Sequence, residues 1–216
     1  IDVPAYCVID KTRMDADSRQ MFGLPAAAEK LGFPLVVKPQ FEGSSIGISI
    51  VKDAPALEDA ARTAFIYGDR IIIEEYINGR ELTVGILDDE PLPVIEIVVK
   101  EQFYNFSAKY QRSDTEYIIP ARIDFVIYNM AHVKARSAYL LLGCDSFSRV
   151  DMILDEKEGR LYVLEVNSIP GLTNHSLLPK AAACAGIDFS GLCMRIIELA
   201  LGKKRGTKIG AETKIV

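Results

Sequence analysis

Apolar and β-branched residues recur in short runs along the chain, and polar residues, glycine or proline bound each run. Runs of four to eight such residues are typical of β-strands. The predicted strands cover residues 5–9, 35–38, 48–51, 70–76, 82–87, 94–100, 147–154 and 160–167.

Between these runs the apolar residues recur every three to four positions, which is the spacing of an amphipathic helix. The predicted helices cover residues 24–31, 54–67, 124–142, 177–185 and 189–201. Asp53 is placed to cap the second of these helices, and Gly143 is placed to end the third. Helices mixed with hairpin-like strand pairs predict an α+β fold, or mixed α/β.

Composition narrows the class of protein. The 216 residues suit one or two compact domains, and 49% of them are apolar, which is enough for a full core. The net charge is −5 and no long basic stripe occurs, so we expect no nucleic-acid partner. No apolar run is long enough to span a membrane, so we expect no membrane partner either.

The cysteines and histidines give no zinc signature. The chain holds two histidines, and its four cysteines lie far apart without C-x-x-C spacing. Apolar neighbours suggest reduced, partly buried thiols, and the predicted location is the cytoplasm. These cysteines are Cys7, Cys144, Cys184 and Cys193.

The stretch LEVNSIPGLTNHS at 164–176 raises the main chemical question, because it sets a carboxylate and an amide two positions apart in a strand. If residues 147–155 and 160–167 form a hairpin that turns at 156–159, Asp151 lies opposite Glu165 and Arg149 lies opposite Asn167. Alternation places these four side chains on one face. The other face is predicted to form the core, with Val150, Met152 and Leu154 facing Tyr162, Leu164 and Val166.

Two opposed carboxylates repel each other in a sheet, and a hard cation would reverse that cost. Mg²⁺ prefers oxygen ligands and commonly shares them with substrate phosphates, which suits Asp151, Glu165 and Asn167. Arg149 beside them can hold a developing negative charge. The same alternation also fits an ordinary solvated hairpin face. The turn after Asn167, where Gly171 lets the backbone approach a ligand, favours the binding site.

A second pattern, VVKPQFEGSSIGISIV at 36–51, places a glycine- and serine-rich loop between two strands. Small residues expose backbone N–H groups that can wrap a phosphate, and Lys38 would add a positive charge. No G-K-[ST] follows, so the loop is not a Walker A motif. A flexible hairpin loop without a ligand fits the pattern equally well.

A third pattern, IIIEEYINGREL at 71–82, ends one strand with two glutamates and starts another after a short hinge. Glutamates there could accept hydrogen bonds from ribose hydroxyls or the adenine amino group, while the backbone near residues 76–77 reads the base edge. Taken alone, the pattern fits charged strand ends better.

Two further segments lack a clear period. Residues 103–122 are polar and aromatic, and a connection of that length is often functional, although a disordered surface loop is the alternative. The tail at 203–216 is polar and basic, and we expect it to fray.

Taken together, these motifs resemble the ATP-grasp superfamily, and most closely the D-alanine–D-alanine ligase family. Their order and spacing match that family from about residue 5 to about residue 201. The resemblance rests on VVKP at 36–39, EGSSIG at 42–47, EEYINGRE at 74–81, FYNFSAKY at 103–110, RVD at 149–151 and LEVNSIPGLTNHS at 164–176.

The resemblance implies a reaction, a division into parts and a set of roles. ATP would phosphorylate the carboxylate of one D-alanine, and the amine of a second would attack the acyl phosphate, for peptidoglycan precursor synthesis. Residues 1–75 would form the central subdomain, 76–202 the C-terminal subdomain, and 203–216 a flexible tail. ATP would lie between the subdomains, and residues 103–120 would close over the site.

The implied binding residues follow the motifs. Lys38 and the Ser45 region would contact the ATP phosphates, Lys109 would reach the γ-phosphate, and Glu74, Tyr76, Ile77 and Glu81 would hold adenosine. Asp151, Glu165 and Asn167 would hold two Mg²⁺ ions, with Mn²⁺ as an alternative. Arg149 and the Gly171 N–H would bind the oxyanion, and Ser176 and Leu177 the carboxylate of the second D-alanine.

Tyr110, hydrogen-bonded to Ser44, would favour D-alanine as the second substrate, because the related D-alanyl-D-lactate ligases carry His there. His175 is interpreted as structural rather than as a base. The loop also has Asn105 and Phe106 where the family more usually has Asp-Tyr.

The family's N-terminal domain, which supplies a glutamate for the first D-alanine, does not precede the first strand. The chain is therefore interpreted as part of a longer ligase that forms a homodimer at full length, and we expect these residues alone to have little or no ligase activity. A short ATP-grasp protein in its own right is the alternative for its length. The rival functions are another ATP-grasp ligase, a non-catalytic nucleotide-binding module and a structural dimerisation domain.

Overall fold

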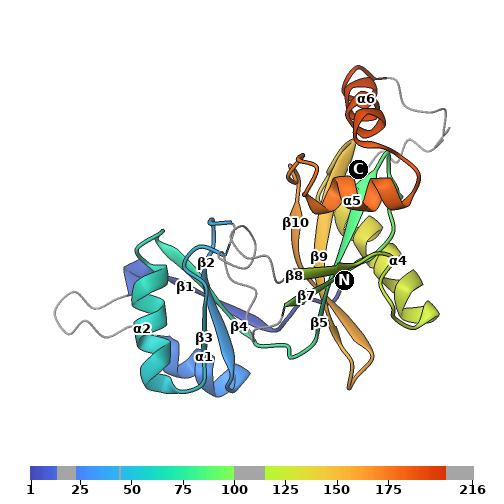
Figure 1. The fold of residues 1–216 in the computed structure, drawn as a ribbon. Helices are drawn as coiled ribbons and strands as arrows, with labels where there is room; N and C mark the ends of the chain where they lie inside the picture. The colour runs from blue at the N-terminus through green and yellow to red at the C-terminus, as the bar shows by residue number, and fades with distance from the viewer. Residues whose placement is uncertain (14–22, 44, 100–114, 203–216) are drawn as a thin grey trace, which may run out of the picture.

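The structure is a computed structural model that describes residues 1–13, 23–43, 45–99 and 115–202. Two antiparallel sheets form two lobes, linked through residues 76–79 (Figure 1). We call the elements up to residue 75 the first lobe, and those from residue 80 onward the second lobe. The fold is mixed α+β, as the sequence predicts.

The first lobe holds a sheet of four strands in the order β1-β4-β2-β3, with all neighbours antiparallel. Its described residues also form two helices and a 3₁₀ turn. The elements are β1 (Tyr6–Asp10), η1 (Lys11–Arg13), α1 (Leu24–Leu31), β2 (Leu35–Pro39), β3 (Ser49–Val51), α2 (Ala54–Ala64) and β4 (Arg70–Glu75).

Both helices of the first lobe pack on the same face of its sheet. Leu35 and Val37 on β2, and Ile71 and Ile73 on β4, pack with Leu57 of α2 in one buried cluster. The alternate residues of these strands point to the opposite face, because successive strand residues face opposite ways. Within the described residues, no helix therefore packs on the other face of this sheet.

The second lobe holds a sheet in the order β10-β9-β5-β7-β8, with β6 paired to β5. Helices cover both of its faces: α4 packs on one, and α5 with α6 on the other. The elements are β5 (Arg80–Leu87), β6 (Glu90–Pro91), β7 (Ile95–Val99), β8 (Thr115–Ile118), α4 (Phe125–Leu141), β9 (Phe147–Asp155), β10 (Arg160–Asn167), α5 (Leu177–Cys184) and α6 (Phe189–Ala200).

Local signals account for several boundaries. The Asp53 side chain accepts a hydrogen bond from the Ala56 N–H, which confirms the predicted cap of α2. Gly143 has a φ of 65° directly after α4 and its cap residue Leu142, a left-handed conformation that glycine adopts without strain.

Three details differ from the prediction. Helix α2 ends at Ala64 rather than at residue 67, because the N–H groups of Ile66 and Tyr67 bond in tight turns to carbonyls three residues back. The strands β6 and β8 were not predicted, and β8 lies in the segment that we interpreted as a loop. It pairs with β7 over Thr115–Ile118, so partner contacts rather than a local apolar run define it.

The third difference is a β-bulge in β10. Val163 pairs with Met152 but Glu165 pairs with Asp151, so Leu164 is an extra residue in the ladder. Leu161, Val163 and Val166 therefore pack in the α4 core. The prediction that Tyr162 and Leu164 share that core face was wrong.

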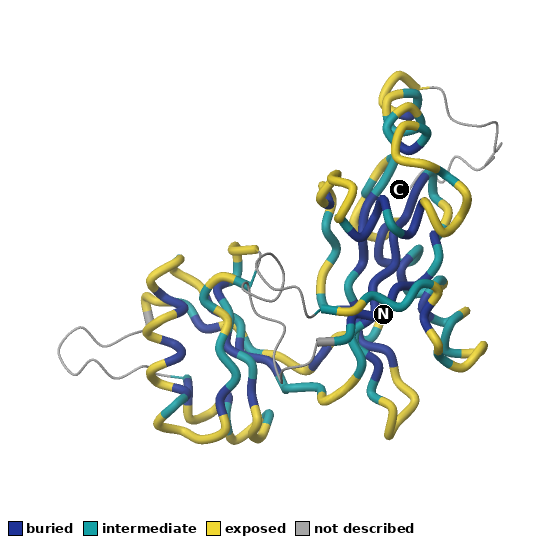
Figure 2. The backbone as a smooth tube through the Cα atoms, viewed as in Figure 1, coloured by how far each residue is buried: buried dark blue, intermediate teal, exposed yellow. Residues whose placement is uncertain are grey.

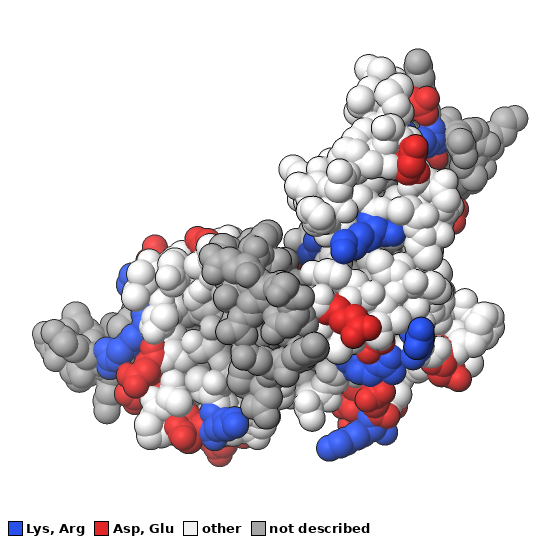
Figure 3. Space-filling model, in the orientation of Figure 1, with Lys and Arg blue, Asp and Glu red and all other residues white. Residues whose placement is uncertain are grey.

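Buried residues form the centre of each lobe (Figure 2). On the face seen in Figure 3, acidic and basic side chains lie next to each other rather than in patches of one sign. Within the described ranges, no helix is both long and apolar enough to cross a bilayer. The four cysteines, all of them described, are free thiols.

Candidate functional site

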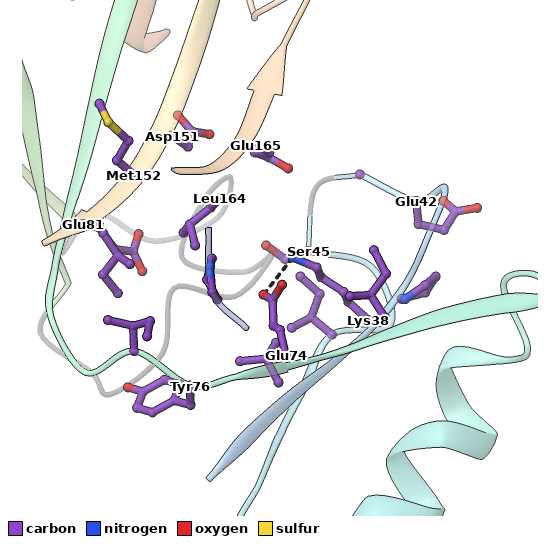
Figure 4. A pocket seen from close by; sticks show the side chains of 18 of the residues that line it. Lys38, Glu42, Ser45, Glu74, Tyr76, Glu81, Asp151, Met152, Leu164 and Glu165 are labelled. Atoms are coloured by element: carbon purple, nitrogen blue, oxygen red, sulfur yellow. Dashed lines mark hydrogen bonds and ion pairs between the residues drawn. The ribbon is translucent and has the colours of Figure 1, made fainter. Parts of the chain in front are cut away.

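A cavity of about 370 Å³ lies between the two lobes, against the helix-free face of the first sheet (Figure 4). The first lobe contributes its β2 and β4 strands and the glycine-rich loop, and the second lobe contributes β5, β7, β9 and β10. A volume of this size suits a small-molecule ligand. The lining includes ten of the predicted site residues: Lys38, Ser45, Glu74, Tyr76, Ile77, Glu81, Arg149, Asp151, Glu165 and Leu177.

Strand alternation builds the first-lobe wall. Val36, Lys38 and Gln40 line the cavity, whereas Leu35 and Val37 pack in the first-lobe core. Lys38 Nζ lies 2.8 Å from Glu74 Oε1, and Figure 4 shows this pair at the cavity wall. Both side chains are mostly buried, so this wall presents an ammonium group with a fixed partner.

The glycine-rich loop continues from that wall. Gly43, Ser45 and Ile46 line the cavity, and Ser45 has a φ of 60°. At Gly47 a Cβ atom would lie 2.8 Å from both Pro39 Cγ and Tyr67 Cδ2, so only glycine fits there without displacing them. Ser44, predicted to act in catalysis, lies outside the described residues.

The hinge between the lobes forms the floor of the cavity. Tyr76 and Ile77 line it, and the Tyr76 N–H bonds to the Pro34 carbonyl. A Cβ at Gly79 would lie 2.1 Å from the Leu154 carbonyl oxygen, so the hinge backbone rests directly on β9. This close approach fixes where the hinge meets the second sheet.

Asp151 is the centre of a polar network on the second-lobe wall. Its carboxylate accepts hydrogen bonds from Arg149 Nε at 2.8 Å, Arg149 Nη2 at 2.7 Å and Thr83 Oγ1 at 2.6 Å. The Asn167 Nδ2 group donates to Asp151 Oδ2 at 3.0 Å and to Glu165 Oε1 at 3.1 Å. The predicted pairs Asp151–Glu165 and Arg149–Asn167 are confirmed by the strand register.

This network fits a hard cation. Asn167 places the positive end of its amide between two carboxylates, which is the position where a cation would be attracted. No group of three or more His, Cys, Asp or Glu side chains that could hold a metal occurs among the described residues. A divalent ion here would therefore take the rest of its ligands from water and from phosphate oxygens.

The charges of the side chains that line the cavity also favour a bound cation. Within the described part of the chain, six carboxylates and two cations line the cavity. A polyphosphate would be repelled by this balance unless divalent cations entered with it. The carboxylates belong to Glu42, Glu74, Glu75, Glu81, Asp151 and Glu165, and the cations to Lys38 and Arg149.

The predicted acceptor-substrate residues lie at the start of α5. Leu177 lines the cavity, whereas Gly171, Ser176 and Asn167 are not part of its lining. A Cβ at Gly171 would lie 2.9 Å from Ser176 Oγ, so these two predicted residues are neighbours. Ser176 Oγ accepts from the Thr173 N–H at 3.1 Å, which ties the turn to the helix.

Two predicted catalytic-loop residues, Lys109 and Tyr110, lie outside the described residues. His175 is exposed. The sequence reasoning missed Thr83, whose contact with Asp151 depends on the pairing of β5 with β9. It also missed Gln40, although the alternation of residues 36, 38 and 40 could have indicated that it faces the cavity; its buried Oε1 has no partner among the described residues.

Comparison with known proteins gives a consistent result. Residues 1–198 match the family model described as "D-ala D-ala ligase C-terminus". The chain is 42% identical over 191 residues to a D-alanine–D-alanine ligase from Nitrosomonas eutropha. This match covers 88% of the present chain and 61% of that protein. It is 45% identical over 176 residues to D-alanine–D-alanine ligase B from Xanthomonas campestris, with 82% and 55% covered.

Solved structures agree in fold. A D-alanine–D-alanine ligase from Bacillus anthracis superposes with a TM-score of 0.80 at 35% identity, over 95% of this chain and 64% of that chain. The same enzyme complexed with ATP gives 0.76 at 32%, over 95% and 62%. The VanG D-Ala:D-Ser ligase from Enterococcus faecalis gives 0.77 at 33%, over 92% and 57%. The chain therefore spans 61% of the length of the Nitrosomonas eutropha ligase and 55% of the length of the Xanthomonas campestris ligase.

Proposed function

Because the chain belongs to the family of D-alanine–D-alanine ligase C-terminal regions and has the ATP-grasp fold, we propose that it forms the nucleotide-binding and catalytic part of an ATP-dependent ligase. The reaction joins the carboxylate of one D-alanine to the amine of another and consumes ATP. The observation that carries the proposal is the cavity, where Lys38 and Glu74 of one lobe face Arg149, Asp151 and Glu165 of the other.

The chemistry proceeds in two steps. The carboxylate of the first D-alanine attacks the γ-phosphorus of ATP, which forms an acyl phosphate and releases ADP. The amine of the second D-alanine then attacks the acyl carbon, loses a proton, and expels phosphate as the peptide bond forms. Such transfers depend on positioning and charge neutralisation more than on a protein nucleophile.

Within the proposal the residues divide these tasks. Lys38 and the backbone around Ser45 hold phosphate oxygens, and Lys109 reaches the γ-phosphate. The hinge residues Tyr76 and Ile77 read the base edge. Glu74 and Glu81, whose carboxylates line the cavity, complete the binding site for adenosine.

Asp151, Glu165 and Asn167 would hold Mg²⁺, as two ions, and Mn²⁺ could replace it. When bound, the metal supplies charge neutralisation for the transferring phosphoryl group. Arg149 and the Gly171 N–H stabilise the oxyanion of the tetrahedral intermediate. Ser176 and Leu177 hold the carboxylate of the second D-alanine.

The proposal extends to the organisation of the protein. Residues 1–75 form the central subdomain, 76–202 the C-terminal subdomain and 203–216 a tail. The full-length ligase is a cytoplasmic homodimer without a nucleic-acid or membrane partner, and the four free thiols suit a reducing compartment.

The deciding experiment is an isothermal titration of the 216-residue chain with ATP and Mg²⁺. The Glu165→Gln variant removes one metal-facing charge, and Glu158→Gln, an exposed glutamate of the β9–β10 turn, is the matched control. We expect the wild type and the control to bind and the Glu165 variant to lose binding. Equal binding by all three proteins would contradict the metal site. No binding by the wild type, alone or extended at its N-terminus, would contradict nucleotide binding.

A second measurement addresses catalysis and the amine substrate. We expect little or no D-alanine-dependent phosphate release from residues 1–216, and robust release would contradict that expectation. In the N-terminally extended protein, a panel of D-alanine, D-serine and D-lactate as acceptors tests the role of Tyr110. The D-Ala:D-Ser ligase among the similar structures makes D-serine the informative rival.

A further inference from the structure

Arg80, the first residue of β5, makes an ion pair on the side of the second sheet that faces away from the cavity. Its Nε donates to Glu96 Oε1 at 2.7 Å and its Nη2 to Glu96 Oε2 at 2.6 Å. The Glu96 side chain is 8% exposed and that of Arg80 is 27% exposed. A two-pronged contact of this kind fixes orientation as well as distance.

The same guanidinium reaches two other segments. Its Nη1 donates to Glu156 Oε1 at 3.2 Å, in the turn between β9 and β10, and its Nη2 donates to the Arg122 carbonyl at 3.0 Å, just before α4. The hydrogen bonds to Glu96 raise the pKa of Arg80. One side chain therefore joins β5 to three segments of the second lobe.

Glu81 follows Arg80 and points to the other face, into the cavity (Figure 4). In the ladder it stands opposite Ile97 on β7 and Ile153 on β9. Gly79, on the other side of Arg80, lies against the Leu154 carbonyl. Successive strand residues alternate between the two faces of a rigid backbone. The position of Arg80 therefore determines the positions of the Glu81 carboxylate and of the end of the hinge.

We propose that Arg80 is a positioning residue for nucleotide binding, which acts through Glu81 and the hinge without touching the ligand; this inference rests on the proposed function. The adenosine part of the ligand depends on Arg80, since the hinge and Glu81 are among its proposed contacts. The phosphate part does not, because Lys38, Asp151 and Glu165 stand on other strands. A merely structural role would weaken binding of both parts alike.

The test compares ATP with inorganic tripolyphosphate, each titrated to saturation with Mg²⁺ present. Loss of Arg80 alone would leave the Glu96 charge buried, so the main variant is the double substitution Arg80→Met with Glu96→Gln. Arg80→Lys keeps the charge but loses the two-pronged geometry. The matched control is Arg195→Met, since Arg195 pairs with Asp88 and Glu198 away from the cavity.

We expect the double variant to bind ATP about tenfold more weakly, the scale of one well-placed hydrogen bond to a charged group, and to bind tripolyphosphate as the wild type does. Arg80→Lys should recover only part of the ATP affinity. The control variant should bind both ligands with the affinity of the wild type. Equal weakening of both ligands, or unchanged ATP binding, in a double variant that melts at the wild-type temperature would overturn the positioning role. A wild type that binds neither ligand would overturn the proposed function, and this inference with it.

Discussion

The two lobes use their sheets differently. Among the described residues, helices pack on one face of the first sheet, and its other face forms a cavity wall that carries the Lys38–Glu74 pair, Gln40 and Glu75 among apolar residues. The second sheet is packed on both faces, by α4 on one and by α5 and α6 on the other, yet it carries the Asp151 network. An open face offers a surface against which a ligand can lie, whereas a sheet held from both sides keeps charged groups in fixed positions.

This difference predicts different costs for charge removal in the two lobes. Asp151→Ala should lower the free energy of unfolding by about 4 kcal/mol, because the Arg149 guanidinium, 8% exposed, loses both hydrogen bonds to its partner. Urea denaturation measures the change. Asp155→Ala is the control, since that carboxylate accepts hydrogen bonds from the exposed turn N–H groups of Lys157 and Glu158. Equal losses in the two variants would show that the Asp151 network adds nothing to the second lobe.

A core substitution tests whether the lobes are stabilised separately. Leu57→Ala should cost about 3 kcal/mol, because this α2 side chain is fully buried in the first-lobe core. Hydrogen exchange should speed up in β2 and β4 and stay unchanged in β9. Leu192→Ala, in the α5–α6 core, should give the reverse pattern. Uniform acceleration throughout both sheets would mean that the lobes unfold as one unit.

Lys38→Ala should affect binding more than folding. The Lys38 and Glu74 side chains, 22% and 12% exposed, lie at the wall of an open cavity, so water can reach Glu74 once Lys38 is lost, and the free energy of unfolding should fall by about 1 kcal/mol. Nucleotide affinity should fall about tenfold, since the ammonium group faces the cavity. Calorimetric titration and a thermal melt measure the two effects. Lys52→Ala, an exposed lysine outside the cavity lining, should change neither, and a similar loss of affinity there would argue for a non-specific charge effect.

The smallest effect is expected where the N-terminal residues join the second lobe. Lys134 donates a hydrogen bond to Asp2, and this contact lowers the pKa of Asp2 below its ordinary 3.8. A lowered pKa in the folded protein means that Asp2 adds stability above pH 3.8, and that this contribution is lost as the pH falls through the folded-state pKa.

Asp2→Asn should therefore melt slightly lower than the wild type near neutral pH, and the two melting temperatures should converge as the pH falls below 3.8. Thermal melts across that range measure the difference. A constant gap at every pH would show that the carboxylate charge plays no part.

Much of the fold follows from local pattern. The period-two runs place most strands within a residue or two, and Asp53 marks the start of α2. The hairpin argument places Asp151 beside Glu165 from the length of one turn. Strand β8 escapes such reasoning because its short TEYI run becomes a strand by pairing with β7.

Some features of the site also follow from local pattern, and others depend on which strands become neighbours. The sequence by itself determined which side chains alternate on one strand face, as with Arg149 and Asp151, because that depends only on backbone geometry. Only the tertiary structure decided that Leu164 bulges toward the cavity. The same holds for the hydrogen bond from Thr83 to Asp151 and for the ion pair between Arg80 and Glu96. Those contacts join residues on different strands, and which strands become neighbours is set by how whole sheets and helices pack.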